Sequence, residues 1–340
     1  MKNKLLIIIA LLFLNGFESP SILLAQVSDS TATINKDSIK VETAKQFADT
    51  IYLPSRGNLV FTSVSPVEDP FVSTKFLLGF GIAEIIKTKI PITIGEIDTT
   101  IEIEPDVFYT TGGMEFQFAI RDWAAVKVKA SGVARLGNNF FSLASEGVSA
   151  GTCFDIGWLF RIIENEDLMF SGAITLNTFD LTYIDLIGSK DTTITSVDTL
   201  ITREVIKNYQ SLTSEADLRF AMKFSNVFGM LAKFSADLGQ VYVTENKSSF
   251  QYNFGLAFSI DLRNWIGIPF GIGLGGSIFS NDWRFDSSKP PIYSANLNIA
   301  FYNRNDFTIG VENYIQIIEP QQYDLSFTYA NTKIYMSYYF

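Results

Sequence analysis

The sequence predicts an all-β protein: a transmembrane, antiparallel, up-and-down β-barrel of 12 strands over residues 71–340. Twelve segments carry apolar side chains at every second position, the period of a β-strand with one apolar face. Their connections alternate between short turns and longer loops. Beyond the N-terminus, no apolar run approaches the ~20 residues of a transmembrane helix, so any membrane span must be a strand.

The clearest segment runs from Phe250 to Arg263. Its even positions are all large and apolar, whereas its odd positions are polar or small. It is longer than the roughly 5–6 residues usual in soluble sheets, and ~9–11 tilted residues suffice to cross a bilayer. A strand of a soluble β-sandwich would bury the same face against a second sheet, and this stretch alone does not exclude that alternative.

The N-terminal residues 1–25 have the features of a secretory signal peptide. Lys2 and Lys4 precede the apolar run 5–14, and the small residue Ala25 follows, so cleavage is expected between Ala25 and Gln26. The single cysteine, Cys153, allows no internal disulfide. The chain is therefore expected to be exported and not stapled by disulfides.

Residues 26–70 differ in composition: Ser, Thr, Asp and Lys dominate, and alternation is absent. We expect a mostly irregular leader with a short helix near residues 41–51. Composition favours a mobile tail over a plug or a partner-binding segment.

The twelve expected strands follow in order. They are 76–82, 108–120, 124–134, 150–162, 168–176, 218–224, 228–238, 250–262, 266–278, 293–301, 307–315 and 334–340. Five short turns and six longer loops join them, which places both ends of the barrel on the side of the turns. The loops at 84–106 and 179–215 alternate too, and we expect both to extend as β-ribbons.

Two tryptophans, Trp123 and Trp265, lie at expected short turns, where an interfacial aromatic belt is expected. The last strand alternates and ends in Tyr338 and Phe340, and it resembles the C-terminal recognition signal of outer-membrane barrels. The chain as a whole resembles the broad class of bacterial, porin-like outer-membrane β-barrel proteins. That resemblance implies a Gram-negative outer membrane, periplasmic short turns and a periplasmic leader. The implied partners are outer-membrane lipid and, through the last strand, the barrel-assembly machinery. An unknown periplasmic or surface protein is a further candidate partner.

The chain contains no histidine, so it lacks imidazole for acid–base catalysis or metal binding. The enzymes among outer-membrane β-barrel proteins are the phospholipase, the omptin proteases, the lipid A deacylases and the palmitoyl transferase, and all of them rely on a catalytic histidine. We therefore expect no enzyme, catalytic residue, cofactor or metal. A net charge of −10 without a basic cluster argues against nucleic acid.

The segment Gly271–Gly276 matches a dinucleotide motif, but its alternation continues straight through, and the motif needs a strand turning into a helix. Its inward glycines instead leave part of the lumen wall bare, which could admit solute or accommodate a folded-in loop.

The positions that alternate with the apolar ones are expected to face the lumen, and many of them are charged. The expected lumen-lining cations are Lys127, Lys129, Arg135, Arg161, Arg219, Lys223 and Lys233, and the acids are Glu115, Asp155, Asp217, Asp237, Asp261 and Glu312. These residues could form a pore that favours anions or ion pairs that fill a narrow barrel. The expected function is a porin-like passive channel for small solutes, with anions as candidates. The alternative is a non-conducting structural or partner-binding barrel for secretion or surface-complex assembly.

Overall fold

The computed structural model describes residues 53–94, 97–103, 108–136, 147–184, 206–240, 248–280, 291–304, 306–318 and 326–340. These residues belong to one compact unit, Ile51–Phe340. The expected signal peptide and the expected leader helix lie outside the described residues.

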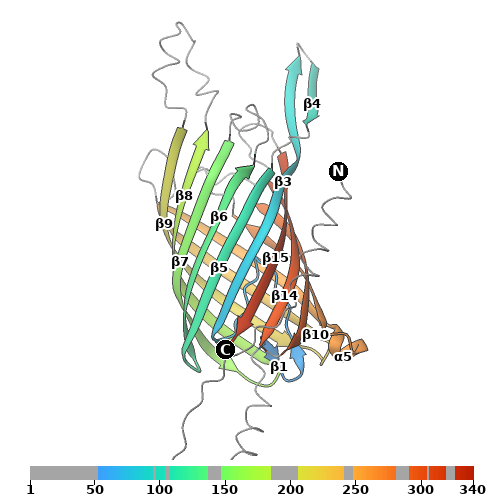
Figure 1. Ribbon diagram of the computed structural model, residues 1–340. Helices are drawn as coiled ribbons and strands as arrows, with labels where there is room; N and C mark the ends of the chain where they lie inside the picture. The colour runs from blue at the N-terminus through green and yellow to red at the C-terminus, as the bar shows by residue number, and fades with distance from the viewer. Residues whose placement is uncertain are drawn as a thin grey trace, which may run out of the picture. The chain divides into compact units, whose positions relative to one another are not determined.

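Twelve strands form one closed antiparallel barrel, which confirms the predicted fold class (Figure 1). They are β3 (Lys75–Ile94), β5 (Phe108–Arg121), β6 (Ala124–Leu136), β7 (Gly147–Glu164), β8 (Leu168–Ile184), β9 (Ile206–Lys223), β10 (Phe228–Gln240), β11 (Ser248–Asp261), β12 (Phe270–Phe279), β13 (Ile292–Arg304), β14 (Phe307–Ile318) and β15 (Ser326–Tyr339). Each strand pairs with the next, and β15 pairs with β3 to close the barrel.

The predicted apolar face points outward. Phe254 on β11 is 47% exposed, and apolar side chains on the other strands are similarly exposed. Because no second sheet covers this face in the described part of the chain, the sandwich alternative is wrong. Trp123 and Trp265 are also exposed, both at the end of the barrel where the turns are short. Among the described residues, no helix is long and apolar enough to cross a membrane.

The connection between β11 and β12 differs from the prediction. A one-turn helix, α5 (Leu262–Ile266), replaces the expected two-residue turn, so Ile266 is helical and β12 begins only at Phe270. Asp261 caps the helix through a bond from the Arg263 N–H, and Gly267 ends it with a φ of 76°, in the left-handed region.

The first predicted ribbon is confirmed. β3 continues to Ile94 and pairs there with β4 (Ile97–Ile103), which belongs to no other pairing. The outer part of the second ribbon, residues 185–205, lies outside the described residues.

Residues 53–74, called the plug below, lie inside the lumen. They include the two-residue strands β1 (Ser55–Arg56) and β2 (Leu59–Val60), found at the short-turn end in Figure 1. For residues 53–70 the expectation of a mobile tail is wrong. The tail was inferred from the polar composition of the whole range 26–70, but this last part carries apolar side chains that are buried against the barrel wall. They are Leu53, Leu59, Val60, Phe61, Val64 and Val67.

Candidate functional site: the plugged lumen and its cavity

The plug enters and leaves the lumen at the short-turn end. On entry, Arg56 forms an ion pair with Glu164 at 2.8 Å, and the carbonyl of Asn58 accepts a hydrogen bond from Asn264 at 2.6 Å. On exit, the Phe340 N–H donates to the carbonyl of Thr74 at 3.0 Å. The segment therefore forms a loop that rises into the barrel and returns.

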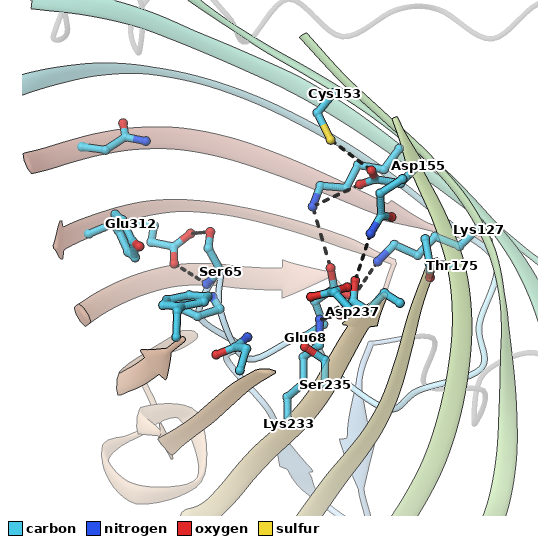
Figure 2. Close-up of a pocket in the computed structure, with 18 of the residues that line it drawn as sticks. Ser65, Glu68, Lys127, Cys153, Asp155, Thr175, Lys233, Ser235, Asp237 and Glu312 are labelled. Atoms are coloured by element: carbon cyan, nitrogen blue, oxygen red, sulfur yellow. Dashed lines mark hydrogen bonds and ion pairs between the residues drawn. The ribbon is translucent and has the colours of Figure 1, made fainter. Parts of the chain in front are cut away.

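The tip of this loop is held by Glu312 on β14. The Ser65 N–H and hydroxyl donate to the two carboxylate oxygens of Glu312, at 2.5 Å each (Figure 2). Below the tip, the Val60 N–H donates to Asp261 at 3.1 Å, and Tyr302 donates to the other oxygen of Asp261 at 2.7 Å. Two predicted lumen acids thus act as anchors for the plug.

The plug touches the wall on all sides. Its hydrogen bonds, ion pairs and close approaches reach every strand from β5 to β14, and also Phe340 directly after β15. The wall residues are Gln117, Lys127, Glu164, Ser171, Arg219, Lys233, Asp261, Gly273, Asn298, Glu312 and Phe340. The short-turn half of the lumen is therefore filled by the chain itself.

Glycines on the inner wall make room for the plug. A Cβ on Gly273 would lie 2.6 Å from the Thr62 carbonyl, and one on Gly275 would lie 2.8 Å from the Val64 side chain. One on Gly255 would lie 2.7 Å from Val67. Real Cβ atoms do not approach so closely. Of the two interpretations of the bare wall, the folded-in loop is the one that the structure shows.

Glu68 is the electrostatic centre of the plug. Its carboxylate lies 2.6 Å from Lys127 (Figure 2), 2.6 Å from Arg219, 3.8 Å from Lys129 and 4.0 Å from Lys233. Burial alone would raise the pKa of the Glu68 carboxyl, but these cations, Arg219 foremost, hold that pKa well below its usual value. The carboxyl of the seated plug is therefore ionised at neutral pH.

Each of the four cations also contacts a carboxylate on the wall. Arg219 binds Asp217 with two bonds of 2.7 Å, and Lys233 lies 2.9 Å from Glu215. Lys129 lies 3.8 Å from Asp155, and Lys127 lies 3.9 Å from Glu115. Each cation is thus compensated by Glu68 on the plug and by an acid on the wall. Such compensation offsets the cost of removing charges from water.

The other three predicted cations lie elsewhere along the barrel. Arg161 pairs with Asp122 and Glu164 at the short-turn rim, and Lys223 lies 3.8 Å from Asp167 at the same rim. Arg135 lies toward the long-loop end of β6, opposite Tyr109. The seven cations therefore do not form one continuous basic wall.

Sequence reasoning missed the residues that complete the network: Ser65, Glu68, Asp69, Lys75 and Glu215. Lys75 bridges Asp69 at 3.1 Å and Glu115 at 3.3 Å. Glu215 could have been found, because it shares the inward parity of Asp217 on a strand that begins earlier than expected. The plug residues carry no alternation and therefore gave no such signal.

Beyond the plug tip, the lumen contains a polar cavity of about 460 Å³. Ser65, Pro66 and Glu68 form part of its lining. The described wall contributes lysines and acids in similar number: Lys127, Lys129, Lys233 and Lys333, with Asp155, Glu215, Asp237 and Glu312. This volume falls in the range of roughly 300–1,000 Å³ typical of ligand pockets.

No protein-family model matches the chain, and no curated protein matches it. Solved structures with a similar fold include the translocator domain of autotransporter NalP from Neisseria meningitidis, with 7% identity, a TM-score of 0.49 and coverage of 89% of this chain and 95% of that chain. They also include the NanC porin, with 8% identity, a TM-score of 0.46 and coverage of 77% and 98%. The KdgM porin in complex with disordered oligogalacturonate has 6% identity, a TM-score of 0.43 and coverage of 78% and 99%. With its closed antiparallel barrel of twelve strands and its apolar exterior, the chain has the architecture of the bacterial outer-membrane β-barrel class.

Proposed function

We propose that this protein is an outer-membrane channel for small polar solutes that is closed at rest by its own plug. The observation that carries the proposal is the position of Glu68, which lies within 4.0 Å of four cations of the barrel wall. These ion pairs hold the plug to the wall without a covalent bond. A segment held in this way can leave as a unit, because both of its ends lie at the same end of the barrel.

The pairing of charges bears on selectivity. An anion preference would require the cations of β6, β9 and β10 to face solute unpaired. Instead, each of the four lies near a wall acid that stays in place when the plug and its Glu68 leave, and the wall of the cavity contributes four acids beside four lysines. We therefore propose a channel with little net preference for solute charge, in place of the anion preference expected from the strand residues alone.

The second candidate is a non-conducting barrel that serves structure or partner binding. The observation that favours it is the completeness of the plug seat, in which Leu59, Val67 and Asp261 are all fully buried. In this alternative the plug never leaves, and the protein acts through the ribbon of β3 and β4 or through other surfaces.

A reversible lock on the plug separates the two candidates. The Thr62 N–H donates to the Ser259 hydroxyl at 2.8 Å, so the plug and β11 are in direct contact at these two residues. A disulfide bridges residues in such contact, with Cα atoms roughly 4.4–6.8 Å apart. The variant Thr62→Cys/Ser259→Cys is made in a Cys153→Ser background, and its conductance is measured in planar bilayers before and after reduction. Cys153→Ser alone is the matched control.

Under the channel proposal, the oxidised variant is silent, and reduction restores the intermittent current of the control. Current through the oxidised variant would show that the plug does not close the lumen. If neither the reduced variant nor the control carries current, and liposomes that contain the protein stay impermeable to small sugars, the non-conducting barrel is favoured.

A further inference from the structure

We infer that the cavity above the plug is a binding site for a short zwitterion, of the class of a peptide of a few residues with free termini. The inference deepens the proposed function and rests on it only for the passage of the ligand, not for its binding. Three features of the cavity carry it: an unpaired carboxylate on one wall, an unpaired ammonium on the opposite wall, and a buried amide between them.

The carboxylate is Asp237 on β10. Among the described residues no cation lies within 4.0 Å of it, and its Oδ1 atom has no hydrogen-bond partner. Its direct cross-strand neighbour on β9 is Glu215, and the nearby Lys233 is already bound to Glu215 at 2.9 Å. Two carboxylates side by side repel each other, so this wall favours an incoming ammonium group.

The ammonium is Lys333 on β15. Its direct cross-strand neighbour is Glu312, which would be its natural partner. Both oxygens of Glu312 instead accept hydrogen bonds from Ser65 at the plug tip. Within the described part of the chain no carboxylate lies within 4.0 Å of Lys333, and its Nζ lies 6.0 Å from the centre of the Tyr335 ring. The seated plug thus leaves one lysine available to a carboxylate.

These two side chains face each other across the lumen. The strand order β15-β14-β13-β12-β11-β10 places them five strands apart in a barrel of twelve, nearly half of its circumference. Both line the same cavity. A ligand that meets both must carry opposite charges at its two ends, and each extended peptide residue adds up to about 3.3–3.6 Å of reach.

A third group fits the body of such a ligand. Asn253 lines the cavity from β11, is only 8% exposed, and its Oδ1 atom has no hydrogen-bond partner among the described residues. A buried amide without a partner is costly, and a peptide N–H would satisfy it. A neutral sugar offers a donor to this amide but neither charge, and a simple inorganic ion offers one charge, whereas a short peptide with free termini offers all three groups.

The test uses the oxidised Thr62→Cys/Ser259→Cys variant in detergent, in the Cys153→Ser background, with triglycine as the probe and isothermal titration calorimetry as the readout. Triglycine is expected to bind, whereas triglycine blocked by N-acetylation and C-terminal amidation is expected to bind at least about tenfold more weakly, the loss expected for charge-assisted hydrogen bonds. Asp237→Asn and Lys333→Met should each weaken triglycine binding by about the same factor, and Asp122→Asn, an exposed turn residue, should not.

A charge exchange sharpens the test. The double variant Asp237→Lys/Lys333→Asp keeps one charge of each sign on opposite walls and should bind triglycine better than either single variant does. Equal binding of free and blocked triglycine, or no binding to the locked protein, overturns the inference. Binding is measured on the oxidised variant and conductance on the reduced variant, so the two proposals fail separately. If the oxidised variant binds triglycine but the reduced variant does not conduct, only the channel proposal is refuted. If the reduced variant conducts but the oxidised variant does not bind triglycine, only the zwitterion site is refuted.

Discussion

Removal of one charge from the plug, by Glu68→Gln, is the sharpest test of the closed lumen. The substitution keeps the size of the side chain but leaves Lys127 and Arg219, each 2.6 Å from the carboxylate, without their plug partner. Breaking a buried ion pair by removing one partner costs ~3–5 kcal/mol. The low end applies here, because Asp217 and Glu115 remain beside these cations.

A loss of about 3 kcal/mol in the seated state corresponds to roughly a hundredfold rise in the ratio of open to closed channels, at ~1.4 kcal/mol for each factor of ten. The cations are solvated once the plug leaves, so the substitution has little effect on the open state. Open probability in planar bilayers measures this ratio directly.

Asp122→Asn is the matched control, since it removes an exposed turn carboxylate whose one ion-pair partner among the described residues is Arg161, at 3.3 Å. Its open probability should equal that of the unmodified protein. If Glu68→Gln opened no more often than this control, the Glu68 network would not hold the plug, and the reasoning would be refuted.

Three further outcomes are expected. Gly273→Val should displace the plug and raise the mean current, because a side chain there meets the Thr62 carbonyl, whereas Gly132→Ala, with its nearest heavy atom at 3.5 Å, should leave the current unchanged; an equal effect of both would contradict the glycine seat. Lowering the pH from 7.5 to 5 should not open the channel: the pKa of Glu68 is depressed in the seated plug, so its contribution is complete above the ordinary value of 4.5 and is lost only as the pH falls through the depressed pKa. A current that rises with a midpoint near pH 6 would assign the control of opening to other groups. Phe254→Arg, on the outer face, should cost ~2–4 kcal/mol near the bilayer midplane and reduce the yield of heat-modifiable protein, while inward Asn253→Arg should assemble better; equal yields would argue against a lipid-facing Phe254.

The alternation of the sequence was enough to predict the barrel and which face of each strand points outward. Alternation is a local property, since successive side chains of a strand point to opposite faces, so the stretch around Phe254 defined its outer face without knowledge of any neighbour. The even strand count and the two kinds of connection followed from the same pattern. The inward parity of Lys127 and Arg219 was also readable, because it is the complement of the apolar face.

What the inward residues do became clear only from the folded barrel. Parity does not give the height of a residue along the lumen, so it did not separate Arg161 and Lys223 at the rim from Lys127 at the centre. The role of Glu68 depends on four cations from three strands that meet at one point, separated from it by 59 to 165 residues of sequence. Ion pairing acts through space at a few ångströms, and no local pattern records which distant side chains will be brought within that range. The bare glycine wall raised the possibility of a folded-in loop, but only the packed structure showed that residues 53–74 fill it.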